Sequence, residues 1–352
     1  MRIAFAPYLL KFKEPGGTSR GVMTEKPTFL IKFYDEREPE KFGIGEAAVF
    51  PGLSPEVDGN YVNKLIELMA NVALGKETDL SRHSSIQFGL EQAILDYSNG
   101  CEQIYFNNKF SRGKEDIMIN GLVWMGDYEI MIERLEKKIK EGFQCVKLKI
   151  GAINWEKELS LIKSVRDRFS SEILTIRLDA NGAFTPANVM DKLYQLAPYD
   201  IHSLEQPIKA SQPEEMRKIC KESPIPIALD EELIGKYSEK DKIETLEKIK
   251  PQYIILKPAL CGGFSGASEW IKSARETDTG WWVTSALESN IGLNAIAQWT
   301  FNSEAKGAQG LGTGEVFTNN FSTRVERVGE FLHYNVNKPI DYSQFDNLNW
   351  HS

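Results

Sequence analysis

The sequence contains little that would suit a secreted or membrane protein. Cysteine is scarce, and Cys101, Cys145, Cys220 and Cys261 stand far apart without any CxxC pair. This spacing predicts reduced, mostly buried thiols rather than a disulfide framework or a zinc site. No apolar run approaches the length of a membrane span, and the first residues lack the apolar core of a signal peptide. We therefore expect a soluble, cytoplasmic chain.

The chain also lacks an excess of basic residues. Its 42 Lys and Arg residues are outnumbered by 50 Asp and Glu residues, which gives a net charge of −8. This balance argues against a nucleic-acid partner, because a phosphate backbone is bound by clustered cations. Neither GxGxxG nor GxxxxGK[ST] occurs, which disfavours an open nucleotide-binding sheet. Small anionic ligands remain compatible with the composition.

The order of predicted elements divides the chain into two architectures. Residues 1–50 are rich in β-type sequence, with a strand at 28–35 and a Gly/Pro-rich turn region at 43–53, and helical patterns follow at 61–74 and 84–100. From residue 117, strands and helices alternate in repeats of about 25–30 residues, which predicts a parallel sheet closed as a (β/α)8-type barrel. The expected units are an α+β domain at 1–105, a barrel at 106–315 and a C-terminal segment at 316–352 that returns to the first domain.

Two lysines stand close together in the strand sequence CVKLKIG, residues 145–151. Lys147 and Lys149 are two positions apart, so a strand directs both side chains to one face. Taken alone, this pattern is typical of a solvated edge strand. In a barrel, however, the carboxyl ends of the strands converge on one mouth, where active sites lie. The residues that end the other strands therefore decide the meaning of the two lysines.

Three acids end the next three predicted strands at spacings of about one repeat. They are Asp179, Glu205 and Asp230, and Lys257 ends the strand that follows. Any one acid could cap a helix. Three carboxylates that meet at one mouth repel one another unless a cation balances them, and Mg²⁺ prefers such oxygen ligands. The pattern predicts a Mg²⁺ site flanked by lysines, and a lysine beside other cations has a lowered pKa suited to a general base. Such a metal would bind a substrate carboxylate and stabilise the enediolate left by removal of the α-proton.

These motifs resemble those of the enolase superfamily, in its muconate-lactonising-enzyme-like branch. The resemblance is carried by KLK (147–149), LDANG (178–182), EQP (205–207), LDEEL (229–233), LKP (256–258) and GIGEAA (43–48). It implies a modified TIM barrel, (β/α)7β, with an N-terminal α+β capping domain. It also implies that Asp179, Glu205 and Asp230 are the ligands of Mg²⁺, for which Mn²⁺ can substitute.

Within this branch, SLEQPI, IALDEEL, ILKPALCGGF and SALESNIGL resemble the o-succinylbenzoate synthase family of menaquinone biosynthesis. That family dehydrates 2-succinyl-6-hydroxy-2,4-cyclohexadiene-1-carboxylate by syn elimination of water. The resemblance implies that Lys149 takes the proton and then helps the hydroxide to leave. It implies that Lys257 acts as a cation that stabilises the enediolate, and that Lys147 keeps the pKa of Lys149 shifted.

An N-acylamino acid racemase or a dipeptide epimerase is the alternative. Two opposed lysines permit 1,1-proton transfer at a carbon next to a carboxylate. Dipeptide epimerases of the same branch carry an Asp-X-Asp on the last barrel strand, which holds the α-ammonium group of the substrate. The corresponding segment, GLGTGEVF (310–317), has only Glu315. Dehydration is therefore favoured over racemisation.

The remaining predictions concern contacts with a small carboxylate substrate. The candidate substrate-binding residues are Ser285, Ser289, Gly262, Gly263 and Arg20. Asn181 and Glu231 are expected to orient the neighbouring ligands and lysines. The glycine-rich segment PGGTSRG (15–21) is either a lid over the site or a plain turn between strands. The sequence leaves the oligomeric state open, including a homo-oligomer.

Overall fold

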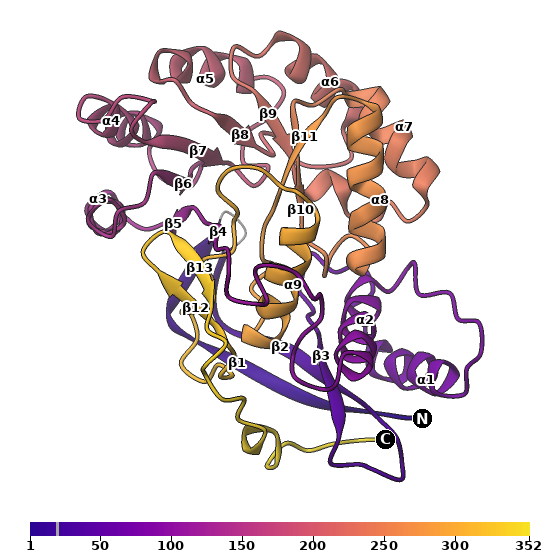
Figure 1. Ribbon diagram of the computed structural model, residues 1–352. Helices are drawn as coiled ribbons and strands as arrows, with labels where there is room; N and C mark the ends of the chain where they lie inside the picture. The colour runs from indigo at the N-terminus through magenta and orange to yellow at the C-terminus, as the bar shows by residue number, and fades with distance from the viewer. Residues whose placement is uncertain (19–20) are drawn as a thin grey trace.

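An antiparallel sheet and two helices form the N-terminal part of the protein. The computed structural model describes residues 1–18 and 21–352. The sheet contains β1 (Arg2–Thr18), β2 (Gly21–Tyr34) and β3 (Phe42–Ala47). The helices are α1 (Tyr61–Ala73) and α2 (Ser84–Ser98), and they share an apolar core with the sheet (Figure 1). The predicted strand at 28–35 and both predicted helices are confirmed.

The prediction of a turn region at 43–53 is wrong in its first part. Residues 42–47 form the fully buried strand β3. Gly43 and Gly45 belong there because α2 packs directly on this strand. A Cβ atom on Gly43 would overlap the carbonyl oxygen of Ala93, and one on Gly45 would overlap that of Gly89. The glycines therefore allow close packing of a helix on a strand and do not mark a turn.

The barrel consists of a seven-stranded parallel sheet in the order β11-β10-β9-β8-β7-β6-β5, with helices on its outside (Figure 1). In chain order, its elements are β5 (Gly121–Val123), α3 (Tyr128–Lys140), β6 (Cys145–Lys149), α4 (Trp155–Arg166), β7 (Thr175–Asp179), α5 (Val189–Leu196), η1 (Ala197–Tyr199), β8 (Ser203–Glu205), α6 (Pro213–Glu222), β9 (Ile227–Leu229), η2 (Glu231–Leu233), α7 (Glu239–Ile249), β10 (Tyr253–Leu256), α8 (Gly263–Glu276), β11 (Gly280–Val283) and α9 (Asn290–Asn302).

Two residues close this sheet into a barrel. Gln309 forms a parallel bridge with Ile119, next to β5, and Gly310 forms one with Thr284, at the end of β11. The backbone nitrogen of Asn120 donates to the carbonyl of Gln309 at 2.9 Å, and that of Ser285 donates to the carbonyl of Gly310 at 3.0 Å. A short eighth strand thus joins both edges, which is the (β/α)7β arrangement expected from the sequence.

The C-terminal segment lies against the N-terminal sheet. It includes β12 (Val325–Val328), β13 (Phe331–Tyr334) and η3 (Ser343–Phe345). Phe321 and Phe345 pack with Leu30 and Phe42 of the sheet, and both chain ends lie close together (Figure 1). β13 also pairs with β4 (Ile117–Met118), which precedes β5 along the chain. The boundaries at residues 105 and 315 stay a prediction.

Among the described residues, none of the helices combines the length and the apolar composition needed to cross a membrane.

Candidate active site

Five neighbouring strands bring the predicted lysines and acids to one end of the barrel. β6 carries Lys147 and Lys149, β7 ends at Asp179 and β8 ends at Glu205. Lys149 pairs with Asp179 across the sheet, and Asp179 pairs with Glu205. Asp230 directly follows β9, and Lys257 directly follows β10. Because the register is in step across these strands, the acids form the middle of a row with lysines at both ends.

The lysines contact the carboxylates directly. Lys147 Nζ lies 2.9 Å from Asp179 Oδ2 and 2.5 Å from Glu205 Oε2. Lys149 Nζ donates to Asp179 Oδ2 at 2.7 Å, and Lys257 Nζ donates to Asp230 Oδ2. The three carboxylates are almost fully buried. Their charges are therefore balanced by protein cations in a site that excludes most water.

Burial and charge act in opposite directions on these groups. Burial alone would lower the pKa of Lys147 and of Lys257, but the adjacent carboxylates outweigh it and raise both values. In both lysines the neighbouring carboxylates therefore favour the charged ammonium form. Burial also acts to raise the pKa of Asp179, and here Lys147 and Lys149 outweigh it and lower the value. Burial raises the pKa of Glu205, and Asp179 adds to the rise.

Glu205 has one carboxylate oxygen that is not bound by the lysines. Its Oε1 atom is buried and has no hydrogen-bond partner among the described residues. In the part of the chain that the structure describes, no three His, Cys, Asp or Glu side chains are already grouped as a metal cage. Asp179 and Glu205 instead face Lys147, while Asp230 faces Lys257. Three carboxylates, one of them with an unpaired oxygen, are the kind of donor set that a hard divalent cation prefers.

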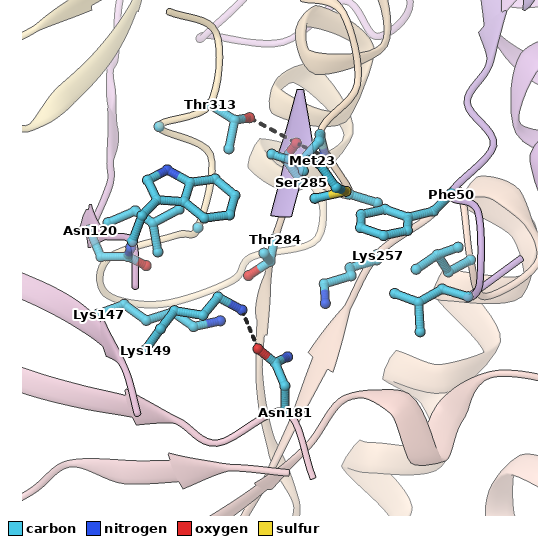
Figure 2. A pocket seen from close by; sticks show the side chains of 18 residues that line it. Met23, Phe50, Asn120, Lys147, Lys149, Asn181, Lys257, Thr284, Ser285 and Thr313 are labelled. Carbon is cyan, nitrogen blue, oxygen red and sulfur yellow. Dashed lines mark hydrogen bonds between the residues drawn. The ribbon is translucent and has the colours of Figure 1, made fainter. Parts of the chain in front are cut away.

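A pocket opens above this row, and Lys147, Lys149 and Lys257 line it. Figure 2 shows Lys149 and Lys257 reaching into it from opposite sides. Its apolar wall consists mainly of Met23, Phe50, Leu53, Trp124, Leu260 and Leu287. The sequence interpretation assigned no role to these residues, because they come from separate segments without a shared motif. The only indication was that PGL (51–53) lies near the capping motif GIGEAA.

Two polar atoms at the pocket wall have no partner among the described residues. They are Thr284 Oγ1, at the end of β11, and Asn120 Oδ1, just before β5. The sequence interpretation missed both and selected the neighbouring Ser285. Ser285 does line the pocket, but its hydroxyl donates to Glu288 Oε2 at 2.5 Å and accepts from the backbone nitrogen of Leu287. Thr284 is therefore better placed than Ser285 to donate to a ligand.

Three of the predicted substrate contacts lie outside this pocket. Ser289 donates its hydroxyl to Glu46 Oε2 at 2.6 Å and caps α9. Gly262 and Gly263 begin α8 with positive φ angles, and a Cβ on Gly263 would overlap the carboxylate of Glu91. The packing of Glu91 accounts for this glycine, and the geometry gives the three residues no contact with a substrate in the pocket.

Arg20 lies outside the described residues. Its neighbours Pro15–Gly17 belong to β1, and Gly21 belongs to β2, with Gly17 paired to Val22. Whether PGGTSRG acts as a lid stays a prediction.

Asn181 and Glu231 lie where residues that orient Lys149 would be expected. Asn181 Oδ1 accepts from Lys149 Nζ at 2.6 Å, and its Nδ2 donates to Glu231 Oε1 at 3.1 Å. The backbone nitrogen of Asn181 also donates to Asp179 Oδ1 at 2.9 Å. Lys149 is thus held between a carboxylate and an amide whose position is itself fixed.

Comparison with known proteins finds one matching family and several similar enzymes. Residues 131–329 match the family described as enolase C-terminal domain-like. The o-succinylbenzoate synthase of Desulfotalea psychrophila is 41% identical over 367 aligned positions, covering 94% of this chain and 98% of its own. The crystal structure of MenC from that bacterium superposes with a TM-score of 0.83 and 38% identity, covering 95% of this chain and 99% of its own. An N-succinyl-L-Arg/Lys racemase from Bacillus cereus is 28% identical over 81% of this chain and 79% of its own.

Proposed function

We propose that this chain, which belongs to the o-succinylbenzoate synthase family of the enolase superfamily, catalyses the dehydration of 2-succinyl-6-hydroxy-2,4-cyclohexadiene-1-carboxylate to o-succinylbenzoate. The observation that supports this most directly is the row Lys149, Asp179, Glu205, Asp230 and Lys257 on neighbouring strand ends beneath one pocket. In the cell this hydro-lyase reaction would serve menaquinone synthesis, and we place it in the cytoplasm, where the four buried free cysteines would stay reduced.

Lys149 is the proton carrier in this proposal. It lies at the pocket floor, held by Asp179 and Asn181, so that its Nζ has a fixed position next to the substrate. As a neutral amine, it takes the proton from the ring carbon that bears the carboxylate. The resulting ammonium then protonates the hydroxide that leaves from the adjacent carbon on the same face. The carbon–hydrogen and carbon–oxygen bonds break, water forms, and the ring becomes aromatic.

Lys257 has the complementary role on the opposite side. The carboxylates around it raise its pKa and keep it protonated, so it offers a positive charge and no free base. That charge stabilises the electrons that build up on the substrate carboxylate when Lys149 removes the proton. Lys147, bound between Asp179 and Glu205, holds the floor together and adds a further positive charge beside Lys149.

Asp179, Glu205 and Asp230 would hold a divalent cation, Mg²⁺ or Mn²⁺. The unpaired Oε1 of Glu205 and the all-carboxylate donor set support this assignment. When bound, the cation supplies positive charge beside the substrate carboxylate and makes the α-proton more acidic. The apolar wall of Met23, Phe50 and Trp124 would cover the ring and keep bulk water away. Thr284 Oγ1 could donate to the second carboxylate of the substrate.

The direct test is an assay of the purified protein with the cyclohexadiene substrate, following o-succinylbenzoate by chromatography. We expect turnover with Mg²⁺, loss of turnover after EDTA treatment and recovery on adding Mg²⁺ or Mn²⁺. Absence of product under all of these conditions would contradict the proposed function. Turnover that persists in EDTA would contradict the metal assignment alone.

Racemisation of N-acylamino acids is the second candidate, because Lys149 and Lys257 approach the pocket from opposite sides. Among the described pocket-lining residues, however, there is no Asp or Glu to hold an ammonium group or a cationic side chain. Glu315 does not supply one, since it is exposed and paired with Arg327 at 2.8 Å. Measuring racemisation of N-succinylamino acids beside dehydration would rank the two activities.

A further inference from the structure

A group of charged side chains that the proposed chemistry does not use is buried between the N-terminal sheet and the barrel. Lys26 of β2 is 1% exposed, and Glu46 of β3 and Glu288 before α9 are both 0% exposed. Lys26 Nζ and Glu288 Oε1 have no hydrogen-bond partner among the described residues. Burying unpaired charged atoms is costly, so this arrangement calls for an explanation beyond packing.

Glu46 connects the N-terminal sheet to α9. Its carboxylate accepts from the backbone nitrogen of Ser289 at 3.0 Å and from that of Gly292 at 3.1 Å. It also accepts from the hydroxyls of Ser289 and, within the sheet, Thr28. A carboxylate is favourable at a helix N-terminus, where unpaired backbone N–H groups point outward. The sheet is therefore fixed against the first turn of α9.

Glu288, just before α9, connects the start of this helix to the pocket wall. Its Oε2 accepts from the hydroxyl of Ser285, and that hydroxyl also accepts from the backbone nitrogen of Leu287 at 2.9 Å and from Thr313 at 2.8 Å. Leu287 has a φ of 63°, in the left-handed region that a leucine rarely adopts. Ser285 and Leu287 both line the pocket. A strained turn in the wall is thus held by a hydroxyl whose own proton is bound by Glu288.

Lys26 lies two residues before Thr28 on β2, so both buried side chains lie on the face of the sheet where the Thr28 hydroxyl donates to Glu46 Oε1. Burial lowers the pKa of Lys26, and Glu46 and Glu288 oppose that shift. Burial likewise raises the pKa of Glu288, and Lys26 opposes that shift first. Without Lys26, Glu46 and Glu288 would be two buried like charges close enough to repel each other.

We propose that Lys26 is a positioning residue that balances Glu46 and Glu288, and thereby holds the Ser285–Leu287 wall in the shape that binds substrate. The inference rests on the proposed function only for its kinetic readout. It predicts that the N-terminal sheet controls substrate affinity through a buried contact, whereas the proton-transfer chemistry stays with the lysines at the strand ends.

The test compares Lys26→Met with the control variant Lys32→Met. Lys32 is on the same strand, β2, but its ammonium lies over the rings of Phe42 and Trp350. For Lys26→Met we expect KM for the cyclohexadiene substrate to rise at least about fivefold while kcat stays within about twofold. Lys32→Met should change neither. The double variant Lys26→Met/Glu288→Gln should raise KM by less than the product of the two single effects, because Glu46 and residue 288 no longer repel each other as like charges.

A second readout does not depend on activity. Exchange of the Leu287 amide hydrogen with solvent should become at least about tenfold faster in Lys26→Met and stay unchanged in Lys32→Met. Wild-type KM together with wild-type exchange in folded Lys26→Met, or fully additive effects in the double variant, would overturn the inference. If Lys26→Met does not fold, Glu288→Gln replaces it, and unchanged Leu287 exchange in that variant would overturn the inference. A wild-type protein that forms no product tells against the proposed function, and the exchange data then decide the inference by themselves.

Discussion

The floor and the roof of the pocket are built in different ways. The floor, defined here as Lys147, Lys149, Asp179, Glu205, Asp230 and Lys257, is charged and comes from consecutive strands of one sheet. The roof, defined as Met23, Phe50, Leu53, Trp124 and Leu287, is almost entirely apolar and comes from separate segments. The difference suggests a division of work in which the floor performs the chemistry and the roof selects the substrate.

The largest expected effect separates the floor from the roof. Lys149→Ala removes the proposed proton carrier, so kcat should fall at least about 10³-fold, within the range for general acid–base catalysis, while KM changes only a few-fold. Steady-state kinetics with saturating Mg²⁺ would measure this. Lys163→Ala is the matched control, because Lys163 is exposed on α4 and paired with Asp167 at 2.5 Å. Normal turnover by folded Lys149→Ala would contradict the assignment.

The second prediction concerns His202, which affects the stability of the barrel and is not part of the floor. His202 stacks on Tyr253, with ring centroids 5.1 Å apart, and burial followed by the charge of Arg177 lowers the pKa of His202 to about 4. An unfolded chain binds a proton at this histidine near pH 6.5. Above pH 6.5, His202 is neutral in both the folded and the unfolded chain and does not affect stability. As the pH falls from 6.5 to 4, protonation of His202 favours the unfolded chain, so the free energy of unfolding decreases by no more than about 3 kcal/mol.

His202→Gln lacks this titration. Its free energy of unfolding, measured in urea, should fall less than that of the wild type between pH 6.5 and 4, while kcat at neutral pH stays unchanged. An identical decline in both proteins would show that His202 does not titrate as described. A large change in kcat would show that the floor and its scaffold are not separable.

The sequence predicted the floor well, because each of its residues follows an apolar strand and the spacing repeats. In a closed parallel barrel, such positions necessarily converge at one end. The sequence placed the last barrel strand at GLGTGEVF (310–317), and the bridges that close the barrel form at Gln309 and Gly310, where this segment begins. The roof was not predicted, because Met23, Phe50 and Trp124 meet only after the sheet, the barrel and the connecting loops have packed together.

The glycines illustrate the same limit. GIGEAA and CGGF suggested a turn and a substrate contact, whereas in the structure Gly45 packs against the backbone of Gly89 and Gly263 against the carboxylate of Glu91, both in α2. A sequence shows that backbone freedom or a missing Cβ is needed at such positions. It does not show which distant segment approaches there, because that depends on tertiary packing.

The roof can be tested with Phe50→Ala. Phe50 is 8% exposed and lines the pocket, so its removal should weaken contacts with the substrate ring. We expect KM to rise about tenfold, equivalent to about 1.4 kcal/mol, with kcat changed less than threefold. Phe33→Ala is the control, since Phe33 packs edge-to-face on Tyr97 in the core of the N-terminal sheet and away from the pocket. A fall in kcat as large as that of Lys149→Ala would remove the distinction between roof and floor.

The smallest expected effect concerns Glu91, which joins α2 to the barrel without touching the pocket. Its carboxylate accepts from the backbone nitrogen of Phe264 at 2.5 Å and from the hydroxyl of Ser265, at the start of α8. Both oxygens of Glu91 accept hydrogen bonds, and Glu91→Gln replaces one of them with an amide nitrogen that cannot accept, so the free energy of unfolding should fall by about 1 kcal/mol. Glu67→Gln, on the exposed side of α1, should leave it unchanged. Because Gly263 packs against Glu91 outside the pocket, KM should stay within twofold of the wild type. A clear rise in KM would indicate that the start of α8, with Gly262 and Gly263, contacts the substrate after all.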